Sequence, residues 1–287
     1  MPQLPKRYCR VEFEAVRPDE QGRNAKSLQG VNVRFSIPKY RGQIRGQAKI
    51  SVCNLAGEDI AYLTTYMSPW IEIQKQKKIR LFAGYENNNA MLFAGDILRA
   101  VPTQPPDVWL ECEAIGGYFN NLKTESFTVH GPVSVRQLGA HLAQMQGLSF
   151  RCLCKEETAQ KRLDNFCYTG GLSGSIKKLN DLGCGVFYVE DDVLFLDDAE
   201  PELKAGKTVR LLTEASGLVG IPCPGPIGLE CTTLLDPSIK LGEALEVRSS
   251  RIPSINGLYY PYALTHEGEF RGNEWYTKLK CARFKYG

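Results

Sequence analysis

The feature that most constrains this chain is an alternation of apolar and polar residues, with a period of two, near both ends. Side chains of a strand point alternately to opposite faces, so this pattern is typical of β-strands with one buried face. In the first part it occurs at residues 11–16, 31–37, 47–55, 70–73, 78–85, 91–97 and 108–114. Residues 86–89 are a good hairpin signal, because Asn tolerates positive φ. With a short helix at 57–67, these runs predict a strand-rich domain over residues 1–117.

The middle of the chain changes to a helical period. Ser134 and Gln137 have the spacing of a capping box, apolar residues follow on one face, and Gly147 is a stop signal. A second, shorter helix is expected from Ser175 to Gly183. After it, residues 185–189 and 193–196 flank an acidic turn and predict a hairpin. We therefore expect a compact α+β module over residues 118–205.

The last third returns to strands and is rich in proline and glycine. Strands are expected at residues 229–234, 244–247, 262–269 and 274–284. This third echoes the first, since Ile79 precedes Trp109 by 30 residues and Ile239 precedes Trp275 by 36. We therefore predict an α+β, mainly β fold, in which two related β-barrels, 1–117 and 206–287, flank the module. Trp109 and Trp275 are predicted to be buried barrel anchors on equivalent strands.

Charge is distributed unevenly in a chain of otherwise ordinary globular composition, 43% hydrophobic and 23% charged. Residues 1–100 hold 16 Lys and Arg against 9 Asp and Glu, residues 101–200 hold 8 against 14, and residues 201–287 hold 11 against 9. The formal net charge of +3 does not supply the strongly basic surface that nucleic-acid binding by the whole chain would need. Alternating charge blocks fit a protein that stacks against other proteins, and a solvated surface explains them equally well.

The ten cysteines are informative about compartment. No run approaches the ~20 apolar residues that span a bilayer, and the first 16 residues lack the apolar core of a secretory signal. We therefore expect no membrane anchor, a cytosolic protein, and cysteines that are reduced, metal-free and mostly buried. The alternative is a metal site made by Cys152 and Cys154 with Cys167 and Cys184, although no CxxC pair is present.

Catalytic motifs are not evident. The three histidines, His130, His141 and His266, are scattered, and no GxSxG occurs. Residues 170–175 match neither phosphate-binding glycine motif and predict a loop that caps a helix. Acidic residues at 191, 192, 197, 198 and 200 lack EF-hand spacing, and a pair of glycosidase carboxylates among them stays open. Because no catalytic, cofactor-binding or metal-binding residue is singled out, a structural or interaction role is favoured.

A set of short motifs, in order along the chain, resembles phage tail baseplate hub proteins. In the last third these are residues 217–222, 234–242, 256–259, 266–268 and 271–275, and near the start they are residues 49–55 and 92–97. The resemblance covers both ends of the chain, and the middle agrees in general character alone.

The resemblance implies a structural late protein of the virion, located in the tail baseplate and assembled in the host cytoplasm. Such hubs are homotrimers whose chains each supply two barrels related to the tail tube, so that three chains form a pseudo-sixfold ring. The ring joins the hexameric tail tube protein to the trimeric central spike protein and contacts other baseplate proteins, with a tape-measure protein or DNA in the lumen. The family motif carries no catalytic residues. The alternative is a tail-associated cell-wall hydrolase or carbohydrate-binding accessory protein.

Overall fold

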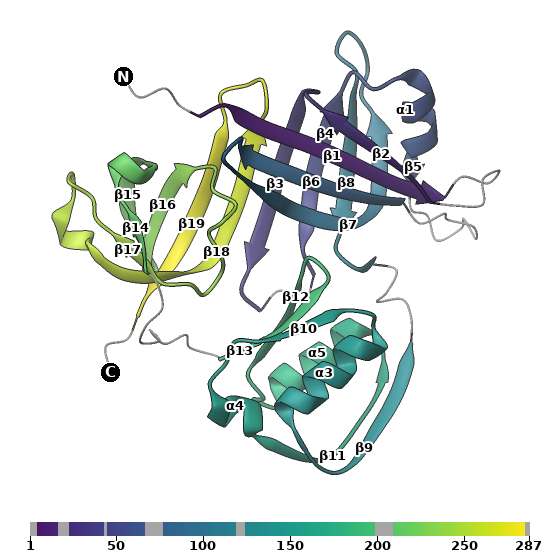
Figure 1. Ribbon diagram of the computed structural model, residues 1–287, viewed down its shortest axis with the longest axis vertical. Coiled ribbons are helices and arrows are strands. Elements are labelled where there is room, and N and C mark those ends of the chain that lie inside the picture. Colours follow the sequence, from purple (N-terminus) through teal and green to yellow (C-terminus); the bar gives the residue numbers. More distant parts are fainter. Residues whose placement is uncertain are drawn as a thin grey trace. The chain divides into compact units, whose positions relative to one another are not determined.

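The computed structural model describes residues 5–16, 23–42, 45–66, 77–118, 124–198 and 209–284. The chain forms two compact units (Figure 1). The large unit comprises Met1–Arg41, Gln47–Ala114 and Glu202–Gly287, and the small unit comprises Gly42–Gly46 and Ile115–Pro201. The strand expected at residues 70–73 lies outside the described residues. None of the helices in the described part is both long enough and apolar enough to cross a membrane.

The large unit is built on one extended sheet. Its first half, here the described residues 5–41 and 47–114, contains β1 (Arg7–Val16), β2 (Arg23–Gln29), β3 (Val33–Tyr40), β4 (Gln47–Cys53), α1 (Gly57–Leu63), β5 (Thr65–Tyr66), β6 (Lys77–Tyr85), β7 (Asn88–Pro102) and β8 (Trp109–Ile115). Its second half, residues 209–284, contains β14 (Arg210–Leu212), η1 (Glu214–Ser216), β15 (Leu218–Gly225), β16 (Gly228–Leu234), β17 (Leu245–Val247), η2 (Pro253–Ile255), β18 (Gly257–Glu269) and β19 (Trp275–Arg283).

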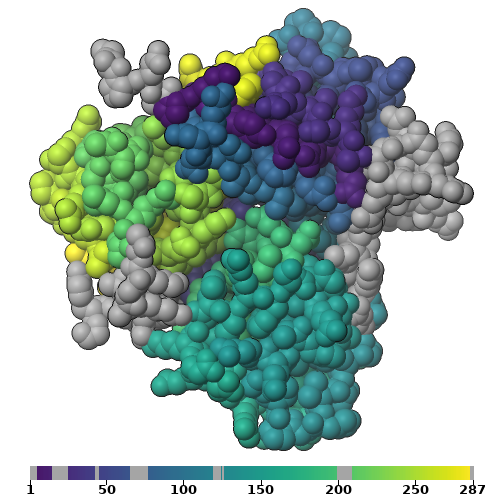
Figure 2. All heavy atoms as spheres, viewed as in Figure 1, coloured from purple at the N-terminus to yellow at the C-terminus, as the bar shows by residue number. Residues whose placement is uncertain are grey.

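The two halves share this sheet. Its main path is β15-β16-β19-β18-β3-β4-β8-β7-β6-β1-β2, with β14, β17 and β5 attached beside it. The link is the antiparallel pairing of β18 with β3, from Ala263 opposite Tyr40 to Glu269 opposite Arg34. In Figure 2, yellow atoms from the end of the chain adjoin purple atoms from its beginning. The fold is therefore mainly β, and no closed barrel is found in the part of the chain that the structure describes.

Two apolar cores fill the large unit. The first packs residues of β1, β3, β4, β6, β7 and β8, and two residues of the second half, Leu235 and Trp275, belong to it. The second core is confined to residues between Leu212 and Cys281. Alternation explains both, since every second side chain of β3 and of β19 is buried along most of each strand. The division of this unit into two barrel domains stays a prediction.

The small unit contains α3 (Val135–Met145), α4 (Glu156–Gln160), α5 (Leu172–Asp181) and two small sheets. One sheet is β10-β13-β12, formed by Ser149–Cys152, Val193–Asp197 and Val186–Glu190, and the other pairs β9 (Glu125–Ser134) with β11 (Arg162–Gly170). The capping box is confirmed, because Ser134 Oγ accepts the Gln137 N–H and the Gln137 side chain binds the Ser134 N–H. The hairpin at 185–196 is also confirmed by the antiparallel pairing of β12 with β13.

The second helix of the small unit begins earlier than expected. Instead of starting near Ser175, α5 begins at Leu172, with Gly171 at the N-cap and no side-chain cap. The loop predicted at residues 170–175 is therefore wrong in extent, because β11 ends at Gly170, Gly171 alone separates it from α5, and residues 172–175 are helical. At Gly174 a Cβ would lie 1.9 Å from the Tyr168 hydroxyl oxygen, so a larger residue there would require the Tyr168 side chain to move.

Candidate functional site

The three histidines do not form a cluster. His130 on β9 and His141 on α3 are exposed in the small unit, whereas His266 on β18 of the large unit is 2% exposed. Among the described residues, no group of three or more His, Cys, Asp or Glu side chains could hold a metal ion. A polar network lies instead at the junction between the two halves of the large unit, where several residues of the hub-like motifs meet.

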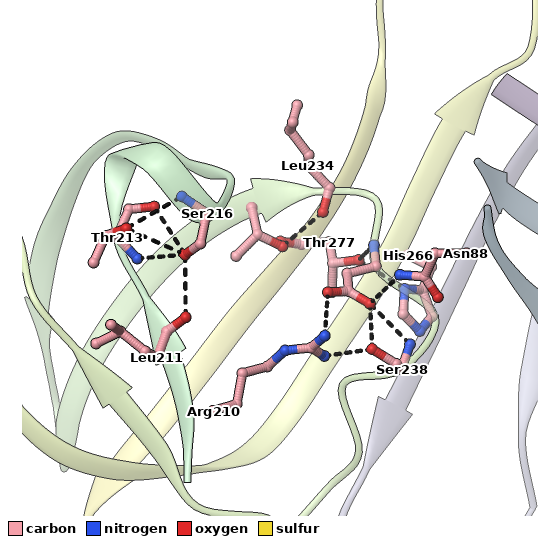
Figure 3. Close-up of polar contacts among 11 residues, drawn as sticks. Asn88, Arg210, Leu211, Thr213, Ser216, Leu234, Ser238, His266 and Thr277 are labelled. Atoms are coloured by element: carbon pink, nitrogen blue, oxygen red, sulfur yellow. Dashed lines mark hydrogen bonds and ion pairs between the residues drawn. The ribbon is translucent and has the colours of Figure 1, made fainter. Parts of the chain in front are cut away.

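Asp236, in the loop after β16, is the centre of the first contact at this junction, and Figure 3 labels its partners Asn88, Arg210 and Ser238. Its Oδ2 lies 3.1 Å from Arg210 Nη2 of β14, and its Oδ1 accepts hydrogen bonds from Ser238 N at 3.0 Å and Ser238 Oγ at 2.6 Å. The same Oδ1 accepts a 3.2 Å hydrogen bond from Asn88 Nδ2, in the β6–β7 hairpin of the first half. One carboxylate therefore ties a loop of the second half to a hairpin of the first.

The network continues into the interior through Thr277 on β19. The Asp236 N–H donates to Thr277 Oγ1 at 3.1 Å, and Thr277 Oγ1 lies 2.9 Å from His266 Nδ1. The tautomer of His266 decides which of the two groups donates in this contact. Burial, together with the charges of Lys39 and Lys240, lowers the pKa of His266 well below its ordinary value. His266 is therefore neutral at pH 7.

Arg7 of β1 makes the second contact, with the turn between β18 and β19. Its Nη1 donates to Glu269 O at 3.1 Å and Gly272 O at 2.6 Å, and its Nη2 donates to Asn273 O at 3.3 Å. A guanidinium presents several donors in a rigid fork, which is why one side chain satisfies three carbonyls of a turn. The N-terminal strand is thereby fixed to a turn more than 260 residues away.

Trp275 begins β19 and lies beneath Arg7. The guanidinium carbon of Arg7 is 5.2 Å from the centre of its ring, and Phe35 of β3 packs edge-on at 5.3 Å. The indole Nε1 donates a 3.2 Å hydrogen bond to Gly84 O of β6. Gly268 allows this packing, because a Cβ there would lie 2.6 Å from the indole ring. The side chain of Trp275 therefore completes the core of the first half.

Trp109, the other predicted anchor, lies on β8 and is 9% exposed, against 1% for Trp275. The guanidinium carbon of Arg34 is 4.0 Å from its ring centre. Both tryptophans are thus buried in the large unit, but Trp275 packs in the first core rather than the second. Their role as equivalent anchors stays a prediction.

Of the acidic residues noted in the sequence of the small unit, Asp198 makes local hydrogen bonds. Asp198 Oδ2 accepts the Lys155 N–H at 2.9 Å, and its Oδ1 accepts the Thr158 hydroxyl at 2.6 Å. Residue 200 of the acidic group lies outside the described part of the chain. Of the four cysteines considered for a metal site, Cys152 and Cys154 are close together, with their sulfur atoms 3.4 Å apart. Cys167 is an exposed residue of β11, and Cys184 is buried.

Comparison with known proteins identifies the family. The family model described as baseplate hub gp41 matches residues 13–281, which is most of the chain. The chain belongs to the baseplate hub gp41 family. The resemblance seen in the sequence is confirmed, and the role of this hub protein is structural, in the baseplate of a phage tail. No curated protein matches the hub sequence.

Solved structures show the same fold at low sequence identity. The hub matches the 43 kDa tail protein of prophage MuSo2 from Shewanella oneidensis with a TM-score of 0.62 and 9% identity, over 96% of this chain and 98% of that one. A tail protein from Neisseria meningitidis gives a TM-score of 0.63 and 9% identity, over 96% of each chain. A type VI secretion component from E. coli, described as structurally similar to bacteriophage T4 tail proteins gp27 and gp5, gives 0.58 and 12%, over 95% and 77%.

Proposed function

We propose that three copies of this hub form a closed ring that joins the hexameric tail tube to the trimeric central spike. Each chain supplies two tail-tube-like barrel domains, 1–117 and 206–287, so three chains present six similar β domains to the tube and one threefold axis to the spike. The observation that carries this proposal is the single sheet that runs through both halves of the large unit, in a chain of the baseplate hub family.

The junction supports this role. A pseudo-sixfold surface requires the two halves of one chain to keep a fixed relation, because a hinge between them would let the six positions drift. The pairing of β18 with β3 supplies a continuous hydrogen-bonded connection. The Asp236 network and the Arg7 contacts then attach the second half to the first at two further places.

The two ends of the sheet path suggest how the ring closes. Within the described residues the path ends at β15 on one side and at β2 on the other. Prolines 222 and 224 remove two N–H donors from β15, which disfavours pairing with a further strand. Ile221, in the same strand, is 53% exposed. A contact between the second half of one chain and the first half of the next is heterologous, and three such contacts close a ring. As in other permanent assemblies, we expect more than about 2,000 Å² buried per interface.

Mass measurement tests the proposal directly. Native mass spectrometry of the purified protein is expected to give a trimer, and quantitative proteomics of tail particles is expected to give three copies. Electron microscopy of the purified oligomer then shows whether six similar β domains surround one lumen. Six copies per tail, or a stable monomer with no place in the particle, would refute the ring, and a monomer that clears cell walls would favour the hydrolase alternative.

A further inference from the structure

Two cysteines of the small unit are arranged for reaction with one another. Cys152 ends β10, Cys154 follows two residues later, and their sulfur atoms are 3.4 Å apart. A disulfide needs ~2.05 Å between the sulfurs, so a small local adjustment is sufficient. We propose that Cys152 and Cys154 form a reversible thiol–disulfide site whose oxidant is a low-molecular-weight disulfide such as oxidised glutathione.

The backbone around the pair holds the two sulfurs together. Leu153 N and Cys154 N both donate to Leu196 O of β13, at 2.8 and 3.3 Å. The next residue, Lys155, is held by its N–H bond to Asp198. The segment is therefore fixed against the end of β13, and the approach of the sulfurs is a property of the folded unit.

The two cysteines differ in a way that assigns their roles. Cys152 is half-buried and Cys154 is buried, so an external disulfide reaches Cys152 first. Burial, followed by the neighbouring Cys152 sulfur and the charges of Asp198 and Asp197, raises the pKa of Cys154 to about 12. Arg136 binds the Glu156 carboxylate at 2.7 Å, and the Cys152 sulfur, followed by that carboxylate, raises the pKa of the guanidinium.

The reaction balances in two exchange steps. Cys152, as a thiolate, attacks one sulfur of oxidised glutathione, the S–S bond of glutathione breaks, and one glutathione thiolate leaves. The Cys154 sulfur then attacks Cys152 of the mixed disulfide, its proton passes to the second departing glutathione, and the protein disulfide forms. Two electrons pass from the cysteines to the oxidant. Because the ring closed by residues 152 and 154 is small and strained, the bond is expected to be reducible by dithiols.

A second cysteine pair provides an internal control. Cys231 on β16 and Cys281 on β19 are both buried, and contact with the Cys231 sulfur, followed by burial, raises the pKa of Cys281. Because both side chains are buried, a small disulfide does not reach them in the folded unit. The proposal therefore predicts that the first pair reacts and the second does not.

The experiment treats the folded, full-length protein with oxidised glutathione, alkylates the remaining thiols after unfolding, and maps the peptides by mass spectrometry. We expect the peptide containing Cys152 and Cys154 to lose the mass of two hydrogens and to regain it with dithiothreitol, while Cys231 and Cys281 are fully alkylated. The variant Cys154→Ser should instead retain one glutathione at Cys152, and Cys152→Ser should leave Cys154 unmodified. Circular dichroism checks that both variants are folded.

Three outcomes overturn the proposal. One is a wild-type protein that stops with glutathione on Cys152. Another is alkylation of both cysteines under conditions in which the exposed Cys167 and Cys223 become glutathionylated. The third is a disulfide that forms to the same extent in the Cys231–Cys281 pair, since the reaction would then report general unfolding.

Discussion

The two halves of the large unit look alike in sequence pattern but differ in how they are packed. The first half contains a core drawn from six strands, and that core includes Trp275 and Leu235 from the second half. The second half has a smaller core made of its own residues, while its Trp275 packs in the core of the first half. The second half is therefore bound to the first through shared side chains, and the echo between them does not make them interchangeable. Substitutions at the junction test this asymmetry.

The largest effect is expected from Trp275→Ala. Removing a large, fully buried aromatic side chain typically costs about 3–5 kcal/mol, and here the substitution also leaves Gly84 O without its donor. The matched variant Trp109→Ala should cost less, because that ring lies nearer the surface, against the charged head of Arg34. Urea unfolding of the two variants measures the difference. Equal losses would restore the equivalence that the sequence echo suggests.

Arg7→Ala should be next in size. The substitution removes three hydrogen bonds to carbonyls of the β18–β19 turn. Because their donor is charged, the unfolding free energy should fall by about 1–3 kcal/mol. Arg7→Lys keeps the charge but lacks the planar fork, so it should recover only part of the loss. Emission from Trp275, which lies under Arg7, should shift in both variants. Lys6→Ala, which breaks an exposed ion pair with Glu86, is the control and should change neither readout.

Asp236→Ala tests the other contact between the halves. The loss of one ion pair and three accepted hydrogen bonds should cost about 1–2 kcal/mol, a modest figure because the Arg210 partner is 39% exposed. Glu230→Ala removes a carboxylate that faces Lys280 at 3.6 Å on the solvent side, and should cost less than about 0.5 kcal/mol. If the two variants lose the same stability in chemical denaturation, the Asp236 network does not hold the halves together.

The stability of the large unit should also depend on pH, through His266. Its pKa is lowered in the folded state, so below about pH 6.5 the unfolded chain binds a proton that the folded chain does not. Stability is therefore fully present above that pH and is lost as the pH falls, by up to about 1.4 kcal/mol per pH unit. Unfolding free energies at pH 7, 6 and 5 measure the slope. His266→Gln should flatten it, whereas His130→Gln, at an exposed site of the small unit, should leave it unchanged.

Elements that are determined by residues close together in the sequence were predictable. The Ser134 capping box and the hairpin around Asp191 and Asp192 need contacts over a few residues alone. By contrast, β2 has little alternation, and its strand form depends on pairing with β1. The start of α5 was missed because Gly171 provides no side-chain cap as a signal. In each case the missing information lies in the tertiary partner or in the backbone.

The junction was only partly accessible to sequence reasoning. Trp109 and Trp275 stood out because each comes at the start of an alternating run, but the sequence does not show which core each one joins. Arg7 carries no local signal, since its partners lie more than 260 residues away. Asp236 belongs to a motif of the hub resemblance, and its interaction with Ser238 two residues later is typical of Asp before a turn. Its contact with Asn88 depends on how the halves meet.

The pairing of β18 with β3 also affects how the chain folds as it is synthesised. Tyr40 leaves the ribosome 223 residues before its partner Ala263, a delay of roughly 10–45 s at ~5–20 residues per second. Throughout this interval one edge of β3 has no partner strand, and the apolar side chains of the first core are not yet covered by Trp275. Such long-range pairings fold slowly and expose the nascent chain to aggregation. The connection that makes the two halves one sheet thus also makes a chaperone useful until the last strands emerge.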